Sequence, residues 1–466
     1  MRKAGRVLLH AEYAYEMCVA VCAMAYTRFV ALGRGSSNLL LKVSARSLSI
    51  IPSSFKQKVK QSMLIVNNNA DHGTALDPAD AEMLSNDSAE IVERFLEFRE
   101  GHKATPLVLL SDLSQKLNVE SIFVKDEGQR LGLGSFKALG GSYAVTRLVL
   151  EEASRALGRI VDVSELHAPE VKAVAHELTF ACATDGNHGR SVAQGAQLVG
   201  AACAIFVHTG VSARRVAAIA KFGAKIIRVD GNYDDSVAEA TRVSLEKGWQ
   251  IVSDTSWPGY ERIPRFVMQG YTALLAEAVR QMPEKPTHVF VQSGVGGIAA
   301  AAAGYFALLY GDDRPFFTVV DPSRAACIVE SARAGMAVKI RHGEPTVMAM
   351  LECYEPSMVA WRILSRSADA FMTVEEDEAI GAMRLLANPV KADPAIVSGE
   401  SGGVGLAALV KVCGKSDYRS KLKLGAGSRV LLINTEGSTD PVLYEELVGA
   451  TPEQVAARSI EIGEKP

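Results

Sequence analysis

The sequence has little of several features that mark whole classes of proteins. Its 466 residues include only seven cysteines, too few and odd in number for a secreted disulfide framework, so a reducing cytoplasm is expected. The longest strongly apolar stretch near the start, 17–26, falls short of the roughly 20 residues that a membrane-spanning helix needs. A formal charge of −3 gives no overall attraction to nucleic acid or to an anionic membrane. These absences favour an enzyme that acts on a small molecule.

The N-terminal segment 1–62 differs in composition from the rest of the chain. Its first sixty residues hold ten Lys and Arg, with Glu12 and Glu16 as the only acids. A basic, acid-poor segment that contains serine is typical of a targeting leader. A translated stretch upstream of a true start at Met63 explains the composition equally well, so both readings stay open.

Beyond this segment the chain is predicted to be an α/β protein with doubly wound parallel sheets. Short apolar runs of the kind that form buried parallel strands alternate with helical patterns. The predicted strands are SIFVKDE, LTFACAT, CAIFVHT, KIIRVD, IVSDT, THVFVQ, FFTVVDP and, further along the chain, VLLIN. The predicted helices cover 138–157, 188–199, 212–221, 233–247, 263–281 and 296–310. Gly223 and Gly248 stand where a left-handed residue ends a helix.

The first candidate for chemistry is Lys137, which follows Ser135 and Phe136 after a glycine-rich stretch and begins a predicted helix. A lysine is electrostatically unfavourable there because the start of a helix carries a partial positive charge. If Lys137 formed a Schiff base with an aldehyde cofactor, the same field would help to keep its free amine neutral and nucleophilic. A solvated surface lysine is the alternative that these residues leave open.

The second candidate is the turn 184–189, with the sequence TDGNHG, between a buried strand and a helix. Its glycines allow close approach of the backbone, and the amides at the helix start suit an anion such as a carboxylate. Asn187 is able to hydrogen-bond a phenolic or carbonyl oxygen. The alternative is an ordinary tight turn capped by Asp or Asn.

The third candidate is a glycine-rich turn between the strand THVFVQ and an alanine-rich helix. It consists of Gly294, Val295, Gly296 and Gly297. Small residues at this position let backbone N–H groups surround a phosphate. The segment also matches the dinucleotide fingerprint, with Ala299 as its last small residue and Asp321 as the acid that binds ribose. An NAD-dependent dehydrogenase is therefore an alternative at this stage.

In chain order, these motifs and the later segment NTEGSTD at 434–440 resemble the fold type II family of pyridoxal-phosphate enzymes. The resemblance is strongest to the diaminopropionate ammonia-lyases and runs from about Thr105 to about Pro441. Its specific segments are GLGSFKALGGSYA at 132–144, ATDGNHGRSVA at 183–193, NYDDSV at 232–237, SDTSWPGYERIP at 253–264, QGYTALLAEAV at 269–279, SGESGGVGL at 398–406 and NTEGSTD.

The resemblance implies two doubly wound domains with the active site between them. The large cofactor-binding domain would comprise 63–143 and 266–466, and the small domain 144–265. Relatives of this fold type are usually dimers, so a homodimer is expected. No partner beyond a small amino-acid substrate is expected, neither nucleic acid nor a membrane.

The resemblance also assigns roles to residues. Lys137 is similar to the lysine that binds pyridoxal 5'-phosphate covalently and moves the substrate's Cα proton. Asn187 would contact the phenolic oxygen of the cofactor, and the turn 294–297 would hold its phosphate. Thr435 would face the pyridine nitrogen. A neutral hydroxyl does not force that nitrogen to be protonated, which suits elimination better than transamination.

Asp185 is a departure from the serine and threonine dehydratases, which carry a small or hydroxyl residue before Gly-Asn-His. A carboxylate there is able to pair with a β-ammonium group that a hydroxylated substrate lacks. By resemblance, Asp254 in SDTSW is a second acid for the substrate amine or for proton transfer.

The expected reaction is α,β-elimination of D- or L-2,3-diaminopropionate to pyruvate and two ammonia, without a metal. The alternatives are a serine or threonine dehydratase, an NAD-dependent dehydrogenase, and a catalytically idle protein that only binds the cofactor.

Overall fold

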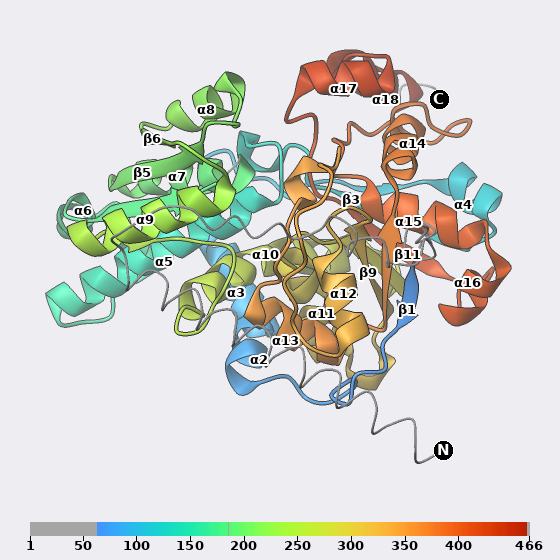
Figure 1. Ribbon diagram of the computed structural model, residues 1–466, viewed down its shortest axis with the longest axis horizontal. Helices are drawn as coiled ribbons and strands as arrows, with labels where there is room; N and C mark the ends of the chain where they lie inside the picture. The colour runs from blue at the N-terminus through green and yellow to red at the C-terminus, as the bar shows by residue number, and fades with distance from the viewer. Residues whose placement is uncertain (1–62, 185, 464–466) are drawn as a thin grey trace, which may run out of the picture. The chain divides into compact units, whose positions relative to one another are not determined.

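The computed structural model of the chain describes residues 63–184 and 186–463. It contains two β-sheets that are covered by helices (Figure 1). The predicted α/β class with parallel sheets is confirmed. The predictions for 1–62 and for the position of Asp185 lie outside the described residues.

The larger sheet has seven strands in the order β1-β10-β9-β8-β11-β3-β2. In that order their bounds are Leu64–Val66, Ala370–Val374, Phe316–Pro322, His288–Gln292, Arg429–Asn434, Ser121–Asp126 and Leu107–Leu109. The inner pairs are parallel, whereas β1 and β2 pair antiparallel at the two edges. The predicted strands lacked these two edge strands, because three apolar residues give no measurable periodicity. They also lacked the inner strand β10.

The smaller sheet has four parallel strands in the order β6-β5-β4-β7. Their bounds are Lys225–Val229, Ala202–His208, Thr179–Ala183 and Gln250–Ile251. The predicted strand IVSDT is wrong beyond Ile251, since the chain leaves the sheet there and Ser253 and Asp254 lie in a loop.

The strands of the smaller sheet all fall within 144–265, and those of the larger sheet all fall outside it. The boundaries after 143 and 265 cut through the helices Lys137–Leu157 and Arg262–Gln281. The two-domain division therefore stays a prediction.

Six of the helices agree with their predicted ranges to within one residue at each end. They are α5 (Lys137–Leu157), α7 (Asn187–Val199), α8 (Ala213–Ala220), α9 (Tyr233–Lys247), α10 (Arg262–Gln281) and α11 (Gly297–Tyr310). Local chemistry explains their ends. Asn232 and Asp235 form a reciprocal capping box at the start of α9. Gly248 ends α9 with φ 70°, and Gly223 follows α8 with φ 78°.

The other α-helices of the described part were not assigned from the sequence. They are α2 (Pro78–Leu84), α3 (Asn86–Glu97), α4 (Ser111–Leu117), α6 (Pro169–His176), α12 (Cys327–Ala334), α13 (Met358–Ser367), α14 (Glu376–Ala387), α15 (Val404–Cys413), α16 (Ser416–Lys421), α17 (Pro441–Val448) and α18 (Pro452–Gly463). Within the described ranges, no helix combines the length and the apolar character that crossing a membrane requires.

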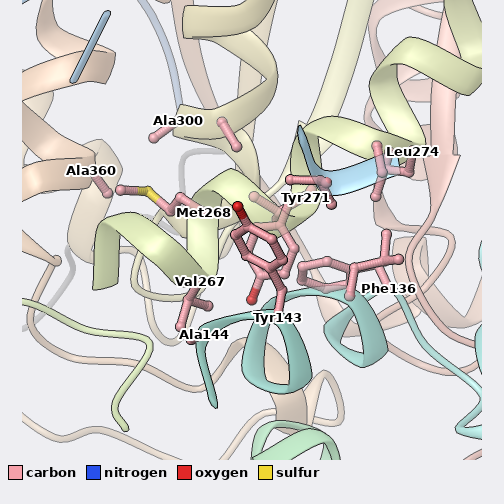
Figure 2. Close-up of a cluster of buried hydrophobic side chains, with 14 of the residues drawn as sticks. Phe136, Tyr143, Ala144, Val267, Met268, Tyr271, Leu274, Ala300 and Ala360 are labelled. Atoms are coloured by element: carbon pink, nitrogen blue, oxygen red, sulfur yellow. The ribbon is translucent and has the colours of Figure 1, made fainter. Parts of the chain in front are cut away.

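Helices α5, α7 and α10 pack very closely because glycines lie at their contacts. A Cβ on Gly140 of α5 would stand 2.5 Å from Cε1 of Tyr271 in α10, and one on Gly195 of α7 would stand 2.7 Å from Cα of Ser142. Figure 2 shows the apolar side chains around this contact, among them Phe136 and Tyr271. The close packing places the first turn of α5, which begins with Lys137, against α10.

Four charged side chains form a buried cluster that the sequence did not reveal. Lys125 Nζ lies 2.7 Å from Glu277 Oε2, and Arg130 Nη2 lies 2.6 Å from Glu277 Oε2 and 2.7 Å from Glu127 Oε1. All four residues are buried. Burial alone would raise the pKa of Glu277, but Arg130 and Lys125 hold it below its usual range. The two cations and two anions balance, and they link β3 to α10.

Replacing Glu277 by Gln should strongly destabilise the fold, because Lys125 and Arg130 would keep only Glu127 as a counterion. Breaking a buried pair from one side costs about 3–5 kcal/mol. The free energy of unfolding from urea denaturation measures the loss. Glu239→Gln, which removes an exposed partner of Arg242, is the matched control and should leave the midpoint unchanged. Equal midpoints for the two variants would show that the cluster does not stabilise the fold.

Candidate active site

Lys137 is the first residue of α5, and its side chain is largely buried, with 20% exposed. Its Nζ is paired with Asp254 Oδ2. The surface-lysine alternative is therefore wrong. Burial lowers the pKa of the amine, but the carboxylate of Asp254 outweighs this effect and raises the pKa above its ordinary value. The expectation of a neutral amine is also wrong for the protein without cofactor, because the counterion dominates over the helix field.

Asp254 lies in the loop between β7 and α10, with 17% of its side chain exposed. Burial would raise its pKa, yet the ammonium group of Lys137 holds the pKa well below the usual range. His188 Nδ1 lies 4.0 Å from Asp254 Oδ2, and Nε2 lies 2.9 Å from the carbonyl oxygen of Val252. Burial lowers the pKa of His188. A neutral imidazole that donates from Nε2 to Val252 fits this geometry.

Tyr260 braces the chain segment that leads to Asp254. Its hydroxyl donates to the carbonyl of Ile251 at 2.8 Å and accepts from the N–H of Ser253 at 3.0 Å. Its ring stacks on Trp257, with centroids 4.1 Å apart. Both aromatic residues thus support the loop that carries the carboxylate.

Asn187 opens α7 and is buried. The preceding turn is capped by Thr184, whose Oγ1 accepts from the N–H groups of Gly186 at 3.1 Å and Gly189 at 3.2 Å. A cap by Asn187 itself is therefore not the arrangement found. Its side-chain amide instead donates to Glu436 Oε2 at 2.6 Å.

Glu436 is a residue of the site that the sequence analysis missed, although it stands inside the segment NTEGSTD. It is buried, and burial together with nearby Glu400 raises its pKa to about 8. Burial also raises the pKa of Glu400. Two buried carboxyl groups that interact in this way hold a proton more readily than exposed ones. The segment NTEGSTD by itself does not distinguish Glu436 as a site residue. Only the contact with Asn187, which is distant in sequence, identifies it.

The turn 294–297 joins β8 to α11 and has the properties of an anion site. Within the described ranges, none of its four N–H groups has a protein acceptor outside the helix. A Cβ on Gly296, where φ is 101°, would stand 2.9 Å from Cβ of Ala360. A Cβ on Gly297 would lie 3.9 Å from Cε2 of Tyr271 and 4.0 Å from the carbonyl oxygen of Asp254. The turn therefore lies beside the segment that carries the partner of Lys137.

Asp321 does not serve as a ribose-binding acid. It is fully buried, and its Oδ2 accepts from the N–H groups of Ile328 and Val329, each at 2.9 Å. Burial raises the pKa of the carboxyl to about 8. The carboxylate of Asp321 caps α12 in the interior of the protein and is not available to bind a ribose. The hypothesis of an NAD-dependent dehydrogenase therefore lacks its ribose-binding acid.

Thr435 directly follows β11 and is buried. Its Oγ1 accepts from Gln292 Nε2 at 2.8 Å and lies 3.4 Å from the carbonyl oxygen of Ser401. Gln292 ends β8 just before the turn 294–297. The hydroxyl that is expected to face the pyridine nitrogen is therefore hydrogen-bonded to the last residue of the strand that precedes the turn 294–297.

A cavity of about 240 Å³ opens beside Asn187. Its described lining consists of Gly132, Leu133, Gly134, Gly186, Asn187, Arg190, Arg214, Arg215, Ala218, Met350, Ser438, Thr439 and Pro441. Met350 Sδ would lie 3.6 Å from a Cβ on Gly186, and its carbonyl oxygen 3.5 Å from one on Gly294. Met350 therefore lies next to both the cavity and the turn 294–297.

These groups fit pyridoxal phosphate. An amine with little exposure is available for an aldehyde, a turn of N–H groups without protein acceptors suits a phosphate, and a buried amide suits a phenolic oxygen. No comparable cluster of metal-ligating side chains occurs in the part of the chain that the structure describes.

Comparisons with known proteins agree with this chemistry. Residues 98–436 match the family model described as "Pyridoxal-phosphate dependent enzyme". Diaminopropionate ammonia-lyase from Escherichia coli K12 is 40% identical over 78% of this chain and 92% of its own length. The protein of that name from Salmonella typhimurium is 38% identical, over 74% of this chain and 88% of its own.

A solved structure of the Escherichia coli enzyme shares the fold. It is described as a complex with an aminoacrylate-PLP azomethine reaction intermediate. Its TM-score is 0.75 at 37% identity, over 83% of this chain and 97% of that one. The chain therefore belongs to the pyridoxal-phosphate dependent enzymes of fold type II and, within them, to the diaminopropionate ammonia-lyase family.

Proposed function

We propose that this chain catalyses the α,β-elimination of 2,3-diaminopropionate to pyruvate and two ammonia, with pyridoxal 5'-phosphate as its cofactor. The observation that carries the proposal is the Lys137–Asp254 ion pair beside a turn of N–H groups without protein acceptors. Family membership supports it, as does the carboxylate of Asp185 before Gly-Asn-His.

The cofactor, when bound, accepts the electrons that remain on Cα after a proton is removed. Lys137 would hold it covalently, the turn 294–297 would hold its phosphate, and Asn187 its phenolic oxygen. Thr435 would face the pyridine nitrogen, while Gln292 keeps its hydroxyl in place.

Lys137 removes the Cα proton from one face of the substrate, and Asp185 acts on the other face. Two bases on opposite faces would let one site process both enantiomers. Asp185 also pairs with the β-ammonium group, which a hydroxylated substrate does not have. Asp254 pairs with the ammonium form of Lys137, so the amine must give up a proton before it acts as a base.

A serine or threonine dehydratase remains the second candidate, since one such enzyme from Haemophilus influenzae is 27% identical over 69% of this chain. A protein that holds the cofactor without turnover is the third. Rates of pyruvate release from D- and L-diaminopropionate and from D- and L-serine separate the three. A homodimer and a cytoplasmic location are further proposals, supported by resemblance and by the small number of cysteines.

Lys137→Ala should remove the covalent link to the cofactor. The expected result is loss of the visible absorbance band of the bound cofactor, together with at least a 10³-fold lower rate of pyruvate release, on the order of the effect of losing a general base and a nucleophile. A variant that retains both the band and the turnover would refute the assignment of Lys137.

Asp254→Asn should lower the pKa of Lys137 in the cofactor-free protein, because burial then acts on the amine without a counterion. More of the amine is neutral at a given pH, so the pH midpoint for attachment of added cofactor should fall. The growth of protein-bound absorbance, followed from pH 6 to 10, measures this midpoint. An unchanged midpoint would show that Asp254 does not control the amine.

Asp185→Ser should shift the substrate preference from diaminopropionate toward serine. The ratio of kcat/KM for the two substrates is expected to change by about 10²-fold or more, because a charged hydrogen bond to the β-ammonium group is lost. Pyruvate release with each substrate provides the measurement. If the ratio stays constant, the β-amine is recognised by another group.

A further inference from the structure

Tyr271 of α10 has a buried hydroxyl with no hydrogen-bond partner among the residues that the structure describes. The side chain is only 2% exposed. A buried hydroxyl without a partner costs about 1–3 kcal/mol. At a candidate active site, this cost is explained if a bound ligand supplies the missing hydrogen-bond partner.

The surroundings of Tyr271 fix its ring between two parts of the site. Phe136, the residue before Lys137, meets the ring edge to face with centroids 4.7 Å apart. On one side, Gly140 leaves room for Cε1, which a Cβ there would meet at 2.5 Å. On the other side, Cε2 lies 3.9 Å from the Cβ position of Gly297 in the phosphate turn. The ring thus stands between the lysine helix and the turn 294–297.

The charges of Lys137 and Asp254 also affect the pKa of the Tyr271 hydroxyl. Burial raises the pKa of Tyr271 above its ordinary value, Lys137 opposes this effect, and Asp254 adds to it. The phenol therefore remains protonated at neutral pH and is available as a hydrogen-bond donor.

We propose that Tyr271 is a further cofactor-binding residue, whose hydroxyl donates a hydrogen bond to the phosphate group of pyridoxal phosphate. The inference rests on the proposed function, because it takes the covalent cofactor at Lys137 as given. The cofactor offers three acceptors, its phosphate, its phenolic oxygen and its pyridine nitrogen. Since the proposed function assigns the phenolic oxygen to Asn187 and the pyridine nitrogen to Thr435, the phosphate is the partner left for Tyr271, whose ring lies beside Gly297.

The test compares pyridoxal phosphate with pyridoxal, which has the same aldehyde and ring but no phosphate. Full-length wild type and Tyr271→Phe are stripped of cofactor, and the dissociation constant of each compound is measured by quenching of protein fluorescence. The variant should bind pyridoxal phosphate about 10- to 100-fold more weakly, the range for a hydrogen bond to a charged group. Its affinity for pyridoxal should change by less than about twofold.

The stability of the stripped protein separates this role from a structural one. Because the hydroxyl has no partner without cofactor, its removal should leave the urea midpoint of stripped Tyr271→Phe unchanged or higher. Tyr444→Phe is the matched control. Tyr444 is also fully buried, and its hydroxyl has no hydrogen-bond partner within the described ranges, but it lies in a separate apolar cluster. The control variant should leave both affinities unchanged.

Three results would overturn the inference. They are an unchanged affinity for pyridoxal phosphate in Tyr271→Phe, equal losses for both compounds, and a lower urea midpoint of the stripped variant. In each case wild type still binds the cofactor at Lys137, so the proposed function stands. If wild type itself forms no covalent adduct with pyridoxal phosphate, the proposed function and this inference fall together.

Discussion

The ion pair between Lys137 and Asp254 is the interaction on which the site depends. Lys137 begins α5, which follows the larger sheet's β3, and Asp254 follows β7 of the smaller sheet. Neither charge is well solvated, so each would be costly without the other. The lysine is unfavourable at a helix start, and the carboxylate offsets this cost. The pair therefore links the segments that follow the two sheets, at the candidate active site.

The same pair explains how the site changes when it is loaded. Covalent attachment of a cofactor requires a neutral amine, so the pair has to give up its charge separation. Asp254 then has no charged partner within ion-pair distance among the described residues, because the imidazole of His188, whose Nδ1 lies 4.0 Å away, is neutral. Burial, no longer opposed by an ammonium group, makes the carboxylate more basic. The carboxylate of Asp254 would therefore accept a proton more readily once Lys137 carries the cofactor.

The sequence predicted the parts of the molecule that local patterns specify. Apolar runs predicted β3, β4, β5, β6, β8, β9 and β11 but not β10, and six helices agree with their predicted ranges. The motifs proposed Lys137, Asn187 and the turn 294–297 as candidate site residues. It did not predict Glu436 against Asn187, nor Tyr271 against Gly297, because these contacts join residues that are far apart in the chain. Asp321 shows that a sequence motif can also suggest a binding residue where there is none. Its position near the end of a strand suggested a ribose ligand, but the structure shows that its carboxylate is buried and caps α12.

Glycines in the lysine motif act on the site through packing as well as through loop shape. Gly141 faces Ser191, whose Oγ would lie 2.9 Å from an added Cβ, and the N–H of Ser142 donates to that Oγ at 3.0 Å. Gly140 meets α10 in the same way. Any side chain at these positions would push α5 away from α7 and α10, and so move Lys137 away from Asn187 and Tyr271. The segment ALGGS after the lysine therefore sets the distances that the chemistry requires, in addition to continuing the helix.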